Sequence, residues 1–113
     1  MKRIDTQDYK GEVLSLKELK ELIEDLPFSG HDFVVFYDDD KDDYVQTILE
    51  NPELDEESAY LIEARVYRQG GDFTHYRTIV AEAEDVFIPF EAFYNDVPFS
   101  YETWEDVTEE FAD

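Results

Sequence analysis

The sequence predicts an α+β fold of one domain, residues 1–113, in which an antiparallel sheet of about four strands with a long central hairpin packs against an N-terminal and a C-terminal helix. Two runs rich in β-branched and aromatic residues meet at Gly70-Gly71, which indicates the hairpin. Apolar helical stripes follow Ser15 and Ser100, which indicates the two helices. With 113 residues, 42% of them hydrophobic, the chain is long enough to form a single core.

The segment 58–84 is the expected central hairpin. Glycine adopts the positive φ that both central positions of a tight primed turn require, so Gly70-Gly71 sets Gln69 opposite Asp72. Side chains alternate along a strand, and this register therefore gives the hairpin one largely apolar face. The residues expected on that core face are Tyr60, Ile62, Ala64, Val66, Ile79, Ala81 and Ala83.

The opposite hairpin face carries Tyr67 and Tyr76, with Arg65 across from Tyr76. Tyrosine mixed with charge is typical of binding surfaces, so this face is expected to meet solvent or a partner. A helix over 55–69, capped by Asp55 and ended by the glycine pair, is the alternative. The alternation on both sides of the glycines favours strands.

Both helices are predicted from capping residues and apolar spacing. Ser15 and Glu18 have the spacing of a capping box, in which each side chain accepts a hydrogen bond from the other residue's amide. This first helix is expected to end at Pro27. A last helix, capped by Ser100 or Thr103, is expected to carry its apolar residues on one side, namely Trp104, Val107 and Phe111.

Three further segments have strand-like patterns. The apolar run 33–37 predicts a central strand covered on both faces. The segment 44–49 is interpreted as the next strand, with a short helix before Pro52 as the alternative. The segment 86–90 extends the sheet or turns away from it at Pro89, followed by one helical turn around Phe93.

The charge is the unusual property of this chain. Its 31 Asp and Glu against 9 Lys and Arg give a net charge of −22, and residues 82–113 contain no Lys or Arg. A compact domain of this length has a radius of gyration of about 13 Å and hence a diameter of roughly 34 Å. Duplex DNA of that length carries on the order of 20 negative charges. The domain therefore has a charge similar to that of DNA of its own length.

The acidic run 38–43 resembles a calcium site only in composition, because hard cations bind several carboxylates. The calcium-loop pattern does not fit: counted from Asp38, position 6 is Asp43 where glycine is needed, and position 12 is Leu49. His31 and His75 lie outside any metal or nucleophile motif, and the sequence has no phosphate-binding glycine loop. We therefore expect no catalytic residue, no metal ion and no cofactor.

The sequence also restricts the expected compartment. Cysteine is absent, which excludes disulfides and thiolate metal sites and fits a reducing environment. No apolar stretch follows Lys2-Arg3, and no run approaches membrane-spanning length. A cytoplasmic protein with no membrane partner is the expectation.

The charge predicts a non-enzymatic inhibitor that presents carboxylates where phosphates would lie. Its expected partner is a basic nucleic-acid-binding protein, such as a nuclease or a restriction or CRISPR effector, and it is not expected to bind nucleic acid itself. In physical type this is similar to the DNA mimics of phages and mobile elements. The expected partner-binding residues are Asp38, Asp39, Asp40, Asp42, Asp43, Glu102, Glu105, Asp106, Glu109, Glu110, Tyr67 and Tyr76.

Two other functions are compatible with the same composition. An immunity or antitoxin protein that neutralises one basic toxin would have the same charge, and so would an acidic accessory domain whose carboxylates serve solubility alone. The number and nature of the binding partners distinguish these three functions.

Overall fold

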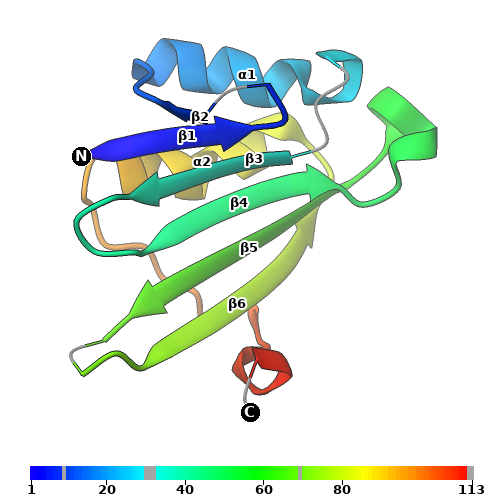
Figure 1. The fold of residues 1–113 in the computed structure, drawn as a ribbon. Coiled ribbons are helices and arrows are strands. Elements are labelled where there is room, and N and C mark those ends of the chain that lie inside the picture. The colour runs from blue at the N-terminus through cyan, green and yellow to red at the C-terminus, as the bar shows by residue number, and fades with distance from the viewer. Residues whose placement is uncertain (9, 30–32, 69, 112–113) are drawn as a thin grey trace.

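The computed structural model describes residues 1–8, 10–29, 33–68 and 70–111, and within these ranges seven strands form one antiparallel sheet (Figure 1). Their order across the sheet is β2-β1-β3-β4-β5-β6-β7. The strands are β1 (Lys2–Thr6), β2 (Lys10–Glu12), β3 (Phe33–Asp38), β4 (Tyr44–Leu49), β5 (Tyr60–Tyr67), β6 (Phe73–Val80) and β7 (Glu105–Asp106). The prediction of about four strands was wrong, because the mixed N-terminal residues pair as two strands at one edge and β7 pairs with β6 at the other.

Two α-helices in the described ranges cover one face of the sheet, α1 (Leu16–Ser29) and α2 (Ala83–Tyr94) (Figure 1). Phe36 of β3 stacks on Phe90 of α2, with ring centroids 6.1 Å apart. The core between helices and sheet contains Ile4, Leu19, Ile23, Leu26, Val34, Phe36, Val45, Ile62, Ala64, Val86 and Phe90. We call the sheet face turned away from these helices the open face.

The start of α1 confirms the capping box. The amide of Glu18 donates to Oγ of Ser15, and the amide of Ser15 donates to Oε1 of Glu18, each at 3.1 Å. The helix continues past Pro27 to Ser29, two residues beyond its predicted end. A proline in the last turn is tolerated here since the buried Leu19, Ile23 and Leu26 hold the preceding turns against the sheet.

The segment 86–90 is helical, so the prediction of a strand or a turn there was wrong. It lies inside α2, where Pro89 supplies no amide and leaves the carbonyl of Asp85 without its usual helical donor. Val86, Pro89 and Phe90 are all buried in the core. Burial of these three side chains therefore outweighs the local cost of a proline within the helix.

The predicted C-terminal helix was also wrong. After α2 the chain passes over the helix side of the sheet, where Tyr101 and Trp104 pack against the core, then pairs with β6 as β7 and ends in a 3₁₀ helix, η2 (Thr108–Phe111). Tyr101 stacks on Tyr76 of β6 with ring centroids 4.7 Å apart, and Trp104 meets Tyr101 edge-on at 5.0 Å. Several β-branched residues lower the helix propensity of this stretch, and acids near its end oppose a helix dipole. Aromatic packing and edge pairing are the more stable arrangement.

The central hairpin forms as predicted, with β5 and β6 antiparallel, but its register differs by one residue. Tyr60 pairs with Val80 rather than Ala81, and Arg65 pairs with His75 rather than lying across from Tyr76. The amide of Arg68 donates to the carbonyl of Asp72, which places three residues rather than two in the loop. Gly70 and Gly71 keep the predicted positive φ, at 95° and 91°.

A one-residue shift in register moves one strand's side chains to the other face. Ile79 consequently leaves the predicted core face and is 56% exposed, whereas Tyr76 joins the face of the buried Ala64. The prediction of Tyr67 and Tyr76 on one shared face was therefore wrong. Tyr67 stays on the open face, where it packs beside Phe73 at 5.6 Å between ring centroids.

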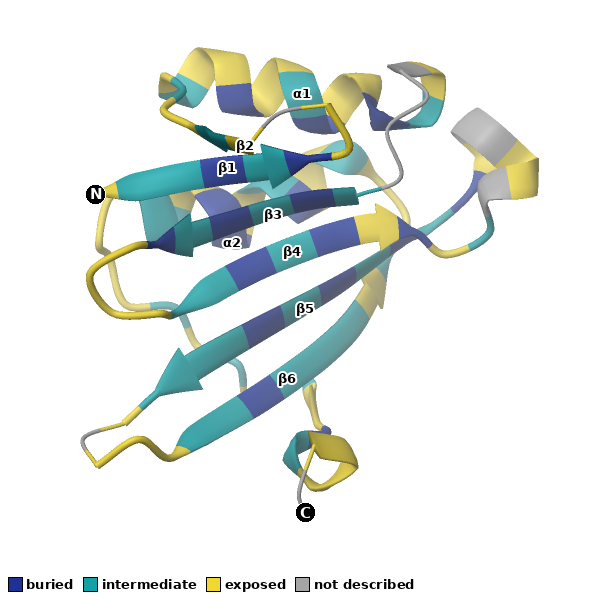
Figure 2. Ribbon diagram, in the orientation of Figure 1, coloured by how far each residue is buried: buried dark blue, intermediate teal, exposed yellow. Residues whose placement is uncertain are grey.

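The strands beside the hairpin show alternating burial (Figure 2). In β3, Val34, Phe36 and Asp38 are buried while the residues between them are half-buried, so only one face of this strand is fully covered. The segment 44–49 is a strand, as favoured over a helix. A 3₁₀ helix, η1 (Pro52–Glu57), connects β4 to β5, so the alternative helix over 55–69 is not formed.

Candidate interaction surface

The acidic run 38–43 forms the turn between β3 and β4. The amide of Asp38 donates to the carbonyl of Asp43 at 3.0 Å, and the amide of Asp40 donates to Oδ1 of Asp38 at 2.9 Å. Asp38 is 6% exposed, so its carboxylate supports the turn from inside. Asp43 accepts a hydrogen bond from the amide of Tyr67 at 2.8 Å, which ties the turn to β5. Only part of this predicted cluster faces solvent.

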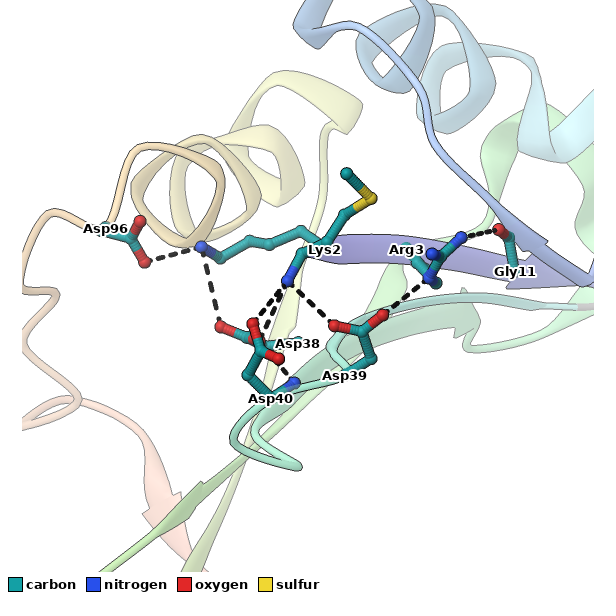
Figure 3. Close-up of polar contacts among 8 residues, drawn as sticks. Lys2, Arg3, Gly11, Asp38, Asp39, Asp40 and Asp96 are labelled. Atoms are coloured by element: carbon teal, nitrogen blue, oxygen red, sulfur yellow. Dashed lines mark hydrogen bonds and ion pairs between the residues drawn. The ribbon is translucent and has the colours of Figure 1, made fainter.

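The first residues of the chain neutralise much of the remaining charge on this turn (Figure 3). The Met1 ammonium lies 2.9 Å from Oδ1 of Asp39 and 2.8 Å from Oδ2 of Asp40. Nε of Arg3 lies 2.7 Å from Oδ2 of Asp39. These contacts lower the pKa of Asp39, the Met1 ammonium contributing most and Arg3 next. The carboxylates of Asp40 and Asp39 raise the pKa of the Met1 ammonium to about 10.

Carboxylate oxygens of Asp38, Asp39 and Asp40 lie within 4.8 Å of one another, close enough to ligate one metal ion. Their neighbours are cations of the chain itself, since Lys2 also lies 3.9 Å from Asp38 and 2.6 Å from Asp96 (Figure 3). A metal ion would have to displace the Met1 ammonium. The arrangement is therefore an internal ion-pair cluster that attaches β1 to the β3–β4 turn.

The predicted C-terminal carboxylates divide into two groups. Oε2 and Oε1 of Glu110 lie 2.9 and 3.1 Å from the two terminal nitrogens of Arg77, and Asp106 accepts hydrogen bonds from Thr108. Glu102, Glu105 and Glu109 are exposed, and their side chains form no ion pair with the residues that the structure describes. These three glutamates are available to a partner.

The two predicted acidic clusters do not form a single site. The turn 39–43 joins β3 to β4, whereas the C-terminal carboxylates lie in and around β7, and β5 and β6 lie between β4 and β7 in the sheet. The two tyrosines lie on different faces, and Tyr76 is covered by Tyr101. A partner that contacts both clusters would have to span the width of these strands.

An acidic groove that the sequence interpretation missed lies between β2 and α1. It has a volume of about 410 Å³ and is lined by Glu12, Leu14, Glu18, Glu21, Leu22 and Asp25. The sequence does indicate the acidic side of this groove, because the spacing of residues 18, 21 and 25 places them on one side of an α-helix. The groove adds exposed carboxylates at the sheet edge opposite β7.

A buried polar cluster on the open face was also missed. His75 is 1% exposed, its Nδ1 accepts a hydrogen bond from Nε of Arg65 at 3.0 Å, and its Nε2 lies 3.4 Å from Glu63. Burial lowers the pKa of His75, and the nearby Glu63 carboxylate opposes this effect in part. The expected structural role of His75 is consistent with these contacts, while His31 lies outside the described residues.

Glu63 is the acceptor at the centre of this cluster. Nε of Arg77 and Nε2 of Gln46 both donate to its carboxylate at 2.7 Å. Burial by itself would raise the pKa of Glu63, but the hydrogen bonds from Arg77 and Gln46 outweigh it and lower the pKa. Both ring nitrogens of His75 already face Arg65 and Glu63, so this imidazole is not placed to act as a base toward a substrate.

In the described residues, no helix is both long and apolar enough to cross a membrane. Neither a protein family, nor a curated protein, nor a solved structure matches this chain.

Proposed function

We propose that this protein is a non-enzymatic inhibitor that mimics nucleic acid and occupies the basic DNA- or RNA-binding surface of a target protein. The supporting observation is the density of charge. The longest axis of the molecule is 40 Å and its net charge is −22. B-DNA of that length carries about 24 phosphate charges at about one per 1.7 Å.

The structure changes the weight given to individual carboxylates within this proposal. Asp38, Asp39, Asp40 and Glu110 are paired with cations of the chain, so they contribute less to an attractive field. Asp42 is exposed in its turn, and Glu102, Glu105 and Glu109 form no ion pair within the part of the chain that the structure describes. We therefore place the contact surface on Asp42, Glu102, Glu105 and Glu109, whereas the groove carboxylates of α1 lie at the opposite edge of the sheet and form a separate acidic surface.

The target fitting this surface is a basic nucleic-acid enzyme of the cytoplasm, of the restriction or CRISPR effector type. Opposite charge speeds the encounter of two proteins and makes their binding sensitive to salt. Direct binding of nucleic acid is disfavoured by the same charge, since phosphates and carboxylates repel each other. Inhibition would follow from occupation of the substrate groove, without any chemical step.

The experiment that tests the proposal is capture of partners by the tagged protein from a bacterial lysate, at low and moderate salt, with and without excess duplex DNA. The expected result is a nucleic-acid enzyme that DNA displaces and whose activity the protein inhibits. A small basic toxin held in a stoichiometric complex that DNA does not displace would replace this function by immunity. Capture that is equally strong at both salt concentrations would also contradict it.

A pair of variants with equal charge locates the surface. Glu102, Glu105 and Glu109 are changed to Gln in one variant, and the exposed Glu50, Glu53 and Glu57 near η1 are changed to Gln in the other. Both lose three negative charges, so a difference in target affinity reports position rather than total charge. We expect the first variant to lose at least about tenfold more affinity than the second. Equal losses would mean that only the overall field matters.

A further inference from the structure

The C-terminal segment 105–111, which we call the strap, passes the edge of β6 and lies over part of the open face. The amide of Val107 donates to the carbonyl of His75 at 2.8 Å, and the amide of His75 donates to Oγ1 of Thr108 at 2.9 Å. The Phe111 ring lies 4.3 Å from the His75 ring, centroid to centroid. The strap therefore holds both the backbone and the imidazole of His75.

The strap covers a cationic and aromatic surface in a protein that is otherwise acidic. The Arg65 guanidinium lies 4.0 Å from the Phe73 ring centroid, 4.6 Å from that of Phe111 and 5.6 Å from that of Tyr44. Glu110 of the strap pairs with Arg77. Phe111 and Glu110 of the strap thus contact the two cations of this surface, Arg65 and Arg77.

The contacts of His75 require its neutral form with the proton on Nε2. Nε of Arg65 always carries a hydrogen, so Nδ1 of His75 must accept it and cannot carry a proton of its own. The remaining nitrogen, Nε2, is then the protonated one and lies 3.4 Å from Oε2 of Glu63. A second proton would place two N–H groups against each other between Arg65 and His75.

Titratable or charged side chains lie around His75 on each element packed against it. Tyr44 lies on β4, Glu63 and Arg65 on β5, Arg77 on β6 and Glu110 on the strap. Glu63 already accepts hydrogen bonds from Arg77 and Gln46, so it is shared with an existing cation. A protonated His75 would add a third positive charge beside Arg65 and Arg77.

We propose that the strap is a pH-gated cover, closed over the surface of Arg65, Arg77, Tyr44 and Phe73 while His75 is neutral and released when His75 is protonated. Release breaks the hydrogen bonds from the Val107 amide to the His75 carbonyl and from the His75 amide to Oγ1 of Thr108, together with the β6–β7 pairing, and moves the imidazole into water. It also uncovers a positively charged patch, which changes the sign of this part of the surface.

The size of the effect follows from proton linkage. An exposed imidazole has a pKa of about 6.5, and burial lowers that of His75, so the open state binds the proton more tightly than the closed state. If His75 stays neutral under the strap, opening becomes up to about 30-fold more favourable at pH 5 than at pH 7.5.

Amide hydrogen exchange of the intact chain tests the proposal at pH 7.5 and pH 5.0, with rates corrected for the intrinsic effect of pH. The amides of Val107 and His75 report the strap directly, because their acceptors lie across the contact. We expect the corrected exchange rate of these two amides to rise between pH 7.5 and pH 5.0, and to rise by more than that of Ile62 in the core. Glutamine can accept from Arg65 and donate to Glu63 but does not titrate, so His75→Gln should abolish the response. His31→Gln is the matched control and should keep it.

Unchanged corrected exchange in the wild type would overturn the proposal, and so would a full response in His75→Gln. If that variant does not fold, the ring ¹⁵N shifts of wild-type His75 supply the second test. We expect the neutral form with the proton on Nε2 at pH 7.5, and protonation only together with loss of Val107 protection. Titration near pH 6.5 with the strap still protected would refute the gate.

Discussion

Arg77 donates from Nε to Oε1 of Glu63 at 2.7 Å, directly across the β5–β6 pair, where the two residues are partners in the register. Glu63 also accepts from Gln46 of β4, and Arg77 also pairs with Glu110 of η2. This chain of contacts links four elements of the open face. It exists only because the register places residues 63 and 77 on the same side of the sheet.

Replacing Glu63 with Gln should destabilise the fold by about 1–2 kcal/mol, because a charged acceptor is lost where Arg77 and Gln46 both donate. Urea denaturation at pH 7 measures the change. Glu109→Gln is the control, since that side chain is exposed and unpaired among the described residues, and its free energy of unfolding should stay within about 0.5 kcal/mol of wild type. Equal effects of the two changes would contradict the assigned role of Glu63.

The lowered pKa of Glu63 also predicts a pH dependence. A carboxyl whose pKa is lower in the folded state stabilises the fold above the unfolded value, here 4.5, and this stability is lost as pH falls through the folded pKa. The difference in unfolding free energy between wild type and Glu63→Gln should therefore shrink below pH 4.5. Urea titrations from pH 7 to pH 3 test this, and a constant difference over that range is the outcome that would count against it.

The pKa of the Met1 ammonium should depend on the carboxylate of Asp40. Its pKa is raised to about 10, mainly by the hydrogen bond to Asp40 and then by that to Asp39. Asp40→Asn should move this pKa toward the ordinary value of 8.0. An NMR titration of the terminal amine measures it, and Asp42→Asn, which removes an equal charge from the same turn, should shift the pKa less. Equal shifts in both variants would show that the pairing is not specific.

The hairpin register can be checked with two truncations of isoleucine. Ile62 is fully buried, so Ile62→Ala should destabilise the fold by about 2–5 kcal/mol. Ile79 is 56% exposed on the open face, so Ile79→Ala should cost under about 1 kcal/mol. Thermal or urea unfolding compares them. The alternative register, with Ile62 opposite Ile79 on the core face, requires similar costs at both positions.

Gly71 has a φ of 91° and no atom near the position of an added side chain. Gly71→Ala should therefore destabilise by about 1–2 kcal/mol through backbone strain alone. Asparagine enters left-handed conformations more readily, so Gly71→Asn should cost less than Gly71→Ala. Unfolding of both variants at the same pH tests this order, and the reverse order would mean that the loop rearranges.

Local signals in the sequence predicted local structure well. Ser15 and Glu18 identified the start of α1 because a capping box depends only on neighbours along the chain. The alternating patterns at 60–67 and 73–80 identified two strands for the same reason. Of the run 83–94 only a helical turn around Phe93 was predicted, because its proline argues against a longer helix, and burial of Val86, Pro89 and Phe90 offsets that cost.

The candidate surface was predicted in composition but not in arrangement. Excess acid in 38–43 and 102–110 is visible in the sequence, yet the pairing of Asp39 with Arg3 and of Glu110 with Arg77 joins residues more than thirty positions apart. Such pairs depend on which strands become neighbours. The groove beside α1 arises in the same way, from β2 folding back along the helix.

The sequence by itself determined the charge of −22, the capped first helix and the two strands of the hairpin, because each depends on composition or on residues close in the chain. The tertiary structure decided the register, the C-terminal strap and which carboxylates are neutralised. A one-residue difference at the Gly70-Gly71 loop turns His75 toward the open face, and only packing of the whole sheet selects between the two registers.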